Sequence, residues 1–333
     1  MGRLTVVDVR KSLFTLLAIV LVSSCSIIAE KTIQPSLLFS EHPLVDKIWD
    51  VRAERFITRQ QLMEQAIASE FLLLGETHDN PVHHRYQAWM IDGLWRHKRS
   101  AVVAFEMISR QQGALIANQQ YDSDESFLAD LKRVPSNWQY DPHYIPLFTA
   151  AINAGFRIRA ASLDRENIRA IGNKGEQEIP SRIKTILDYN VLSGQQEAAL
   201  RKEIVASHCG MDHEGMVSAM MLTQRVKDAV MMDSLLSDEG VQTKILVAGS
   251  GHARKDRGVP KYILQSRPEA KIVSLAWLEV LPEADSVADY AHRWDGEALP
   301  FDYVWFTPRA DRPDPCEQFR QHMKKRESSL EKD

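Results

Sequence analysis

Four acidic and imidazole side chains have the types and positions needed for catalysis or metal binding. Each follows an apolar run of the chain, and the four are Glu76, His78, Glu106 and His252. Carboxylates and imidazoles suit a divalent transition metal, or general acid–base work on a bound substrate. We therefore take the four as the candidate catalytic set of a hydrolase, and Glu76, His78 and His252 as candidate metal ligands. The alternative is that each only makes loop hydrogen bonds at the end of a strand.

The elements that must position these residues are short apolar runs bounded by turn residues. These runs are rich in β-branched and aromatic residues, which is typical of strands buried on both faces. They lie at 71–74, 101–105, 156–161, 245–248, 272–275 and 303–306. Helical patterns separate them, which predicts an α/β fold with a mostly parallel central sheet and helices on both faces. Helical insertions are expected at about 111–148 and 169–240. Because the carboxyl ends of parallel strands share one edge, the four side chains should meet there.

Two helices can be placed from local signals. Asn80 can cap a helix in which Pro81 takes the first position. Apolar residues recur at helical spacing over 222–236, and Gly240 is the expected stop. The first helix carries His84 in its opening turn, where the imidazole could be a ligand or acid–base group, or could simply solvate the helix start.

Two further clusters could receive a flat apolar ligand. Six of the eleven methionines fall between Met211 and Met232, Met216 among them, and flexible methionines suit an irregular apolar surface for a ligand or partner. Helix packing is the alternative. Tyr140 and Tyr144 lie in an aromatic cluster, and a tyrosine phenolate binds ferric iron in some haem proteins. Both tyrosines could equally be core residues at the edge of the sheet.

The N-terminus has the layout of a secretory signal. Basic residues precede the apolar run 13–22, and Val22-Ser23-Ser24-Cys25 follows it. The run is about ten residues long, whereas a spanning helix needs about twenty. The tetrapeptide resembles the bacterial lipobox, whose cysteine is lipidated, and Ser26 resembles the outer-membrane sorting preference of Gram-negative bacteria. Plain signal-peptidase cleavage or an uncleaved helical anchor are the alternatives.

These signals divide the chain into four expected parts. We expect a lipoprotein signal peptide at 1–24, a lipidated Cys25 with a tether to residue 45, the α/β domain at 46–310 and a polar tail at 311–333. The expected location is the bacterial cell envelope, with a lipid anchor in the outer membrane.

Composition and missing motifs narrow the function. The net charge of −4 gives no basic excess, so no nucleic-acid partner is expected. The sequence holds no G-x-S-x-G, no phosphate loop and no G-x-G-x-x-G, which argues against acyl-serine and nucleotide chemistry. Cys209 and Cys316 could pair in an oxidising compartment, but the sequence alone leaves their pairing open.

Several segments together resemble a known family. The run Leu73-Leu74-Gly75-Glu76-Thr77-His78-Asp79-Asn80-Pro81-Val82-His83-His84 is similar to the opening motif of the ChaN-type haem-binding uptake lipoproteins. These belong to a wider group with erythromycin-esterase-like and Tiki/TraB-type proteins. Later segments agree in order, at 104–107, 144–147, 224–231, 249–254, 258–260 and 302–308. The third strand departs from the pattern, since Ser162-Leu163-Asp164-Arg165 stands where relatives tend to carry Asn and Pro before the Arg.

The resemblance implies an envelope lipoprotein that binds haem and serves iron or haem acquisition with an uptake partner protein. It also implies a homodimer enclosing paired haems, with a tyrosine on each iron. Tyr144 is the first expectation for that ligand, and the other candidate haem-binding residues are Tyr140, His84, Met211, Met216 and Arg254. The wider group implies the rival expectation, a metal-dependent hydrolase of the envelope that uses the Glu-x-His pair.

Overall fold

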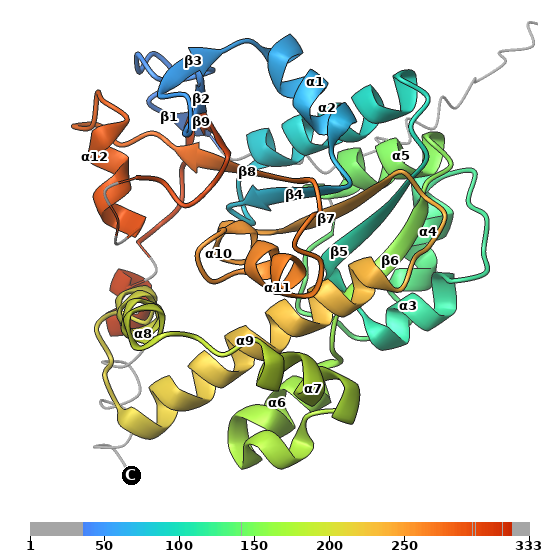
Figure 1. The fold of residues 1–333 in the computed structure, drawn as a ribbon, viewed down its shortest axis with the longest axis vertical. Coiled ribbons are helices and arrows are strands. Elements are labelled where there is room, and N and C mark those ends of the chain that lie inside the picture. Colours follow the sequence, from blue (N-terminus) through green and yellow to red (C-terminus); the bar gives the residue numbers. More distant parts are fainter. Residues whose placement is uncertain (1–35, 141, 295, 297, 315, 322–333) are drawn as a thin grey trace, which may run out of the picture. The chain divides into compact units, whose positions relative to one another are not determined.

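An eight-stranded sheet forms the centre of the protein in a computed structural model that describes residues 36–140, 142–294, 296, 298–314 and 316–321 (Figure 1). In chain order its strands are β2 (Ile48–Asp50), β3 (Arg55–Ile57), β4 (Phe71–Glu76), β5 (Ala101–Ser109), β6 (Arg157–Ser162), β7 (Thr243–Gly249), β8 (Ile272–Glu279) and β9 (Tyr303–Thr307). Their order across the sheet is β3-β2-β9-β8-β4-β7-β5-β6. The neighbours from β9 to β6 are parallel, and β2 and β3 add an antiparallel edge. The predicted fold class and the six predicted strands are confirmed.

Helices cover both faces of this sheet. They are α1 (Arg59–Ala68), α2 (Pro81–Arg96), α3 (Arg110–Ile116), α4 (Asp124–Leu131), α5 (Ile145–Asn153), α6 (Arg165–Lys174), α7 (Ser181–Tyr189), α8 (Gly194–Ser207), α9 (Glu214–Leu236), α10 (Ser250–Ala253), α11 (Val259–Ser266) and α12 (Ala288–Ala291), with short 3-10 turns at Glu176–Glu178 and His292–Trp294. Figure 1 shows α1, α2 and α5 on one side of the sheet and α9 and α11 on the other. The two predicted insertions correspond to the segments carrying α3 to α5 and α6 to α9.

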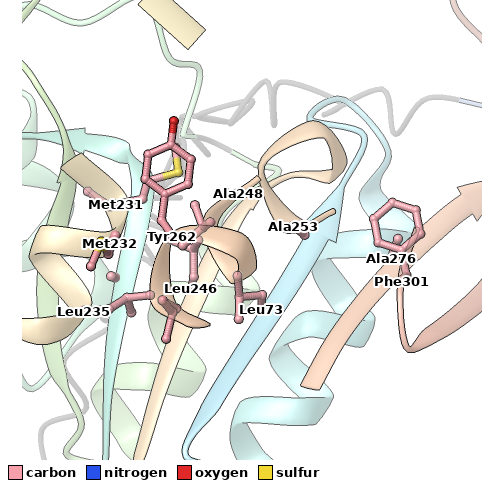
Figure 2. Close-up of a cluster of buried hydrophobic side chains, with 14 of the residues drawn as sticks. Leu73, Met231, Met232, Leu235, Leu246, Ala248, Ala253, Tyr262, Ala276 and Phe301 are labelled. Carbon is pink, nitrogen blue, oxygen red and sulfur yellow. The ribbon is translucent and has the colours of Figure 1, made fainter. Parts of the chain in front are cut away.

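The central strand β4 shows why these runs are continuously apolar. Successive side chains of a strand point to opposite faces, so Leu73 joins the core on the α9 face while Leu72 and Leu74 join the core on the α2 face. Figure 2 shows Leu73 and Leu246 in the first of these cores, with Met231, Met232 and Leu235 of α9 and Tyr262 of α11. Burial on both sides is typical of a parallel strand between two helical layers.

The helix boundaries follow the local chemistry for α2 but not for α9. The side chain of Asn80 accepts a hydrogen bond from the amide of Val82 at 2.9 Å, and Pro81 takes the first helical position, as predicted. Helix α9 ends at Leu236, before the predicted stop. Gly240 instead serves the loop that follows, where its φ of +78° lies in the left-handed region that favours glycine.

The ordered fold begins before residue 46, where the expected tether should have ended. A two-stranded sheet pairs β1 (Leu37–Leu38) with β10 (Arg309–Ala310), and Leu44 is buried in the core. The polar sequence around these residues predicted a linker. Backbone pairing and apolar burial instead make them part of the fold.

The segment after residue 310 is also tied to the fold. Arg312 forms ion pairs with Glu279 and Asp79, and Cys316 forms a disulfide with Cys209, with the two Cα atoms 5.3 Å apart. The pairing that the sequence left open is therefore present. The predicted polar tail is anchored as far as Cys316, since ionic and covalent contacts connect it to distant parts of the chain.

The expected signal peptide and Cys25 lie outside the described residues. Within the part of the chain that the structure describes, no helix has both the length and the apolar character that crossing a bilayer requires.

Candidate functional site

Glu76, the last residue of β4, is a buried carboxylate with three side chains gathered around it. Its Oε1 accepts a hydrogen bond of 2.7 Å from the hydroxyl of Tyr144 and lies 2.8 Å from Nδ1 of His78. Its Oε2 lies 3.3 Å from Nε2 of His84, in the first turn of α2. Such partners are needed because burying a carboxylate without them costs folding free energy.

Glu106 of β5 is a second buried carboxylate, with partners from the opposite layer. The ammonium group of Lys227 in α9 pairs with Oε1, and the backbone amide of Gly249 donates to Oε2 at 2.9 Å. The Nε2 of His252 lies 3.5 Å from Oε1, while its Nδ1 lies 2.6 Å from Asp228 Oδ1. An acid–imidazole–acid chain thus runs from α9 through α10 to the sheet.

His78 joins the two carboxylates. While its Nδ1 contacts Glu76, its Nε2 lies 3.7 Å from Oε2 of Glu106. The ring can approach β7 because residue 249 is glycine: a Cβ there would lie 3.0 Å from His78 Nε2. The structure therefore brings the four predicted residues together at the carboxyl edge of the sheet, as the parallel topology requires. Their catalytic role stays a prediction.

The cluster shifts the acidity of its members. Burial raises the pKa of Glu106, but the nearby cations of Lys227 and His252 hold it well below its usual range. Burial lowers the pKa of His252, but the carboxylates of Glu106 and Asp228 outweigh this effect and raise it to about 9. For Tyr144, burial and then the adjacent charge of Glu76 raise the pKa far above its ordinary value.

The predicted metal set does not form a metal site. Among the described residues, no group of three or more His, Cys, Asp or Glu side chains is placed to hold a metal ion. Both oxygens of Glu76 already face Tyr144 and imidazoles, and the ammonium of Lys227 supplies the cation beside Glu106. His252 contacts Glu106 and Asp228, whereas Glu76 contacts His78, His84 and Tyr144.

A cavity of about 770 Å³ opens beside this cluster. It lies between α6, α8, α9 and the segment 134–138, at the ends of β5 and β6. Its walls include the apolar residues Met216, Ala219 and Met220 of α9. Two members of the buried cluster, Glu106 and Lys227, also line it. A molecule in the cavity would therefore touch one end of the charged network.

Most of the predicted haem-binding residues lie away from this cavity. Of that set only Met216 lines it, while Tyr144, Tyr140, His84, Arg254 and Met211 do not.

The residues that lie elsewhere are mostly buried and already bonded. Tyr144 donates to Glu76, and Tyr140 donates to the carbonyl of Met107 at 2.9 Å. Arg254 is 1% exposed and is paired with Glu203. Both phenols are therefore hydrogen-bonded inside the protein, and their role as haem ligands stays a prediction.

Sequence reasoning did not assign the helical half of the cluster. Lys227 and Asp228 complete the surroundings of Glu106 and His252, and Gln224 lies 3.3 Å from His252 Nδ1. The segment 224–231 was noted only as part of the family resemblance. The spacing of the polar residues is a second signal that could identify this half of the cluster. Gln224 and Asp228 are four residues apart and therefore share one face of α9.

The chain belongs to the family described as "Haem-binding uptake, Tiki superfamily, ChaN", which matches residues 62–263. This confirms the family resemblance of the sequence motifs. The match spans the strands that carry Glu76 and Glu106, helix α10 that carries His252, and α6 to α9. A search of curated proteins found no match.

One solved structure shares the fold, and two others show weaker similarity. The ChaN protein of Campylobacter jejuni, described by its cofacial haem binding, is 21% identical, with a TM-score of 0.62, over 78% of this chain and 95% of its own. A succinoglycan biosynthesis protein is 11% identical, with a TM-score of 0.41, over 76% and 92% of the two chains. A mutant erythromycin esterase in its open conformation is 12% identical, with a TM-score of 0.35, over 83% and 86%.

The acidity of His252 predicts a pH-dependent stability. Its pKa of about 9 in the folded chain exceeds the unfolded value of about 6.5, so its contribution is complete below pH 6.5 and lost as the pH rises through 9. The groups facing it are Glu106, Asp228 and Lys227. We expect the free energy of unfolding, measured with urea, to fall by up to about 3 kcal/mol between pH 6.5 and 9.5.

The control is His252→Gln, which keeps a polar side chain but cannot titrate. Its free energy of unfolding should depend less steeply on pH over the same window. Equal slopes for the two proteins would show that His252 is not the titrating group.

Proposed function

We propose that this protein is a lipid-anchored envelope protein that binds haem in the cavity beside α9 and serves haem or iron acquisition. The observation that carries the proposal is the cavity itself, in a chain that belongs to a family described as haem-binding. Ligand pockets commonly measure about 300–1,000 Å³ and are largely apolar with a few placed polar groups. The cavity of about 770 Å³ has that size.

The lining fits the chemistry of haem, an apolar ring with two carboxylates. Met216 and Met220 offer polarizable side chains to the ring. The exposed guanidinium groups of Arg165 and Arg169 in α6 can pair with carboxylates, and Arg169 has no ion-pair partner in the described part of the chain. Two of the four acidic lining residues are paired with cations, Glu203 with arginines and Glu106 with Lys227. The other two are Asp164 and Glu166.

We extend the proposal to a haem-linked homodimer. The Campylobacter jejuni relative is described by cofacial haem binding, which places two haems face to face. One haem in the cavity of each of two chains would provide this pairing. The cavity is open at the surface formed by α6 and the 134–138 segment, where exposed residues such as Arg165 and Asn137 line it.

The membrane attachment rests on Cys25 and the lipobox around it. We expect metabolic labelling with palmitate in bacteria to mark the full-length protein, and Cys25→Ser to abolish both the label and flotation with membranes. Each methylene of an acyl chain that is buried in the bilayer contributes about 0.8 kcal/mol to membrane binding. Several chains therefore give stable attachment. Cys316→Ser is the matched control, because it removes a cysteine but should still be labelled. Label retained in Cys25→Ser would refute the anchor.

Haemin titration of the purified full-length protein tests the cavity. We expect a saturable Soret shift at micromolar haemin, and a loss of affinity of about tenfold or more, equivalent to about 1.4 kcal/mol, in Ala219→Trp, because the indole fills the cavity. Ser218→Trp is the matched control, since Ser218 is the exposed neighbour on α9 and does not line the cavity. Sedimentation of the loaded protein should report two chains and two haemins.

Two results would contradict this assignment. Absence of a saturable shift with the unchanged protein would remove haem binding altogether. Equal affinity in Ala219→Trp, Ser218→Trp and the unchanged protein would leave haem binding but exclude this cavity.

One observation favours a second function, hydrolysis. The chain Asp228–His252–Glu106 has the form of a general acid–base relay, and Glu106 reaches the cavity. A hydrolase would cleave a small ester such as p-nitrophenyl acetate, with a rate at least about a hundredfold lower in His252→Gln. A rate that is unchanged in this variant, or no rate above buffer, would eliminate this function.

A further inference from the structure

We infer that the open edge of β6 is a docking groove for an extended segment of a partner protein, one in which acidic and apolar residues alternate. Strand β6 stands last in the sheet order, so it pairs with β5 on one side only (Figure 1). The inference goes beyond the proposed haem binding and does not depend on it. The groove shares no lining residue with the cavity beside α9.

Two hollows follow one another along this edge. One measures about 320 Å³ and lies beside residues 156–159, and the other measures about 340 Å³ and lies beside residues 158–160. Ala117, at the C-terminal end of α3, lines both hollows, and so do Ile158 and Arg159 of β6. The two hollows therefore form one groove along residues 156–160, a stretch of about 17 Å for an extended chain.

The hydrogen bonds of β5 determine which backbone groups of β6 face this groove. The amide of Thr243 in β7 donates to the carbonyl of Ser100, just before β5, so Ser100 faces β7. Val103, three residues farther along, faces the other neighbour, β6, because the backbone groups of successive residues alternate in direction. Val103 is the register partner of Ile158, and in a parallel pair it bonds to the residues on either side of that partner. The N–H and C=O groups of Ile158 therefore point away from β5.

Two contacts agree with this direction. The hydroxyl of Ser234 in α9 donates to the carbonyl of Ala160 at 2.8 Å, and the amide of Phe156 donates to the carbonyl of Ala151 in α5 at 3.0 Å. Among the described residues, neither backbone group of Ile158 and no acceptor for the N–H of Ala160 forms such a bond. Unpaired backbone groups at a sheet edge can accept an added strand from another chain.

On one face of the sheet the groove is apolar. Phe156 and Ile158 pack against the core on the α2 face, and Phe127 and Ile152 line the hollow beside them. An added strand would lie about 4.8 Å from β6 and would place every second side chain on this face. Apolar residues at these positions would remove apolar surface from water.

The groove is also positively charged. Arg110, Arg157 and Arg159 line it, whereas Asp233 is the one acidic residue in its described lining and is itself paired with another arginine. Arg157 and Arg159 share a single carboxylate, that of Asp238. Arg110 is exposed and has no ion-pair partner in the described part of the chain. Acidic side chains at the intervening positions of an added strand would therefore meet guanidinium groups.

Fluorescence anisotropy with a labelled peptide tests the inference on the full-length protein. The probe is fluorescein-labelled Glu-Val-Glu-Val-Glu with an amidated C-terminus, and the control peptide has lysine in place of each glutamate. We expect saturable binding of the acidic probe that weakens as the salt concentration rises. The lysine peptide should bind at least about tenfold more weakly, because its charges oppose those of the groove.

Two pairs of variants locate the binding site. Ala117→Trp should lower the affinity for the acidic probe by about tenfold or more, because the indole would occupy the groove. Ala114→Trp is its control, since Ala114 is exposed on the same helix and lines neither hollow. Arg110→Glu should weaken binding and flatten its salt dependence, whereas Arg52→Glu, in the turn between β2 and β3 at the opposite edge of the sheet, should change neither.

Amide hydrogen exchange tests whether the peptide adds a strand. Exchange at the N–H groups of Ile158 and Ala160 should slow in the complex, because pairing protects them, while exchange at Arg157 should stay the same.

Three results would overturn the inference. The first is no saturable binding of the acidic probe by the unchanged protein, and the second is equal affinity in Ala117→Trp and Ala114→Trp. The third is self-association that Ala117→Trp abolishes in a protein that does not bind the probe, which would assign the edge to a second copy of the chain. Unchanged exchange at Ile158 with saturating peptide would refute strand addition. Haemin takes no part in these measurements, so a failure of the haem-binding proposal is distinguished from a failure here.

Discussion

The buried carboxylate of Glu106 imposes the constraint to which the rest of the site conforms. A carboxylate removed from water costs several kcal/mol unless opposite charge and hydrogen-bond donors surround it. Here the donors come from three places: the ammonium of Lys227 in α9, the imidazole of His252 in α10 and the amide of Gly249 at the end of β7. The sheet and the helical layer above it must therefore dock in one arrangement, since any slippage would leave Glu106 without its partners.

Helix α9 connects the charged cluster around Glu106 with the cavity. Its second half packs on the sheet, where Met231 and Leu235 are buried in the core (Figure 2). Its first half packs against α8 through a separate apolar cluster that includes Val217, Leu200 and Ile204. Lys227 lies between the two halves, beside Glu106 and on the cavity wall. One continuous helix therefore sets both the charged network and the shape of the cavity.

The sequence predicted the sheet well because buried parallel strands have a local signature. Phe71 to Leu74 form an apolar run because both faces of β4 are covered. Such a run can be recognised in the sequence without knowledge of distant contacts. The meeting of Glu76, Glu106 and His252 also followed, since parallel strands present their carboxyl ends at one edge.

The helical contributions could not be predicted in the same way. Lys227 and Asp228 reach the site only because α9 crosses the sheet at a particular angle. The spacing of apolar residues in the sequence predicts a helix but not this angle. The two-residue strand Leu37–Leu38 is too short to give a pattern, and its pairing with Arg309–Ala310 joins the two ends of the fold. The Cys209–Cys316 bond spans 107 positions, so no local spacing indicated it.

The same long-range geometry sets the contacts that Tyr144 would lose if it bound iron. For Tyr144 to bind iron, its phenol would have to leave Glu76, whose Oε1 would lose a 2.7 Å hydrogen bond inside the core. The ring would also have to leave its contact with His84, at a centroid distance of 4.3 Å. Losing a donor to a buried charged group costs about 1–3 kcal/mol or more.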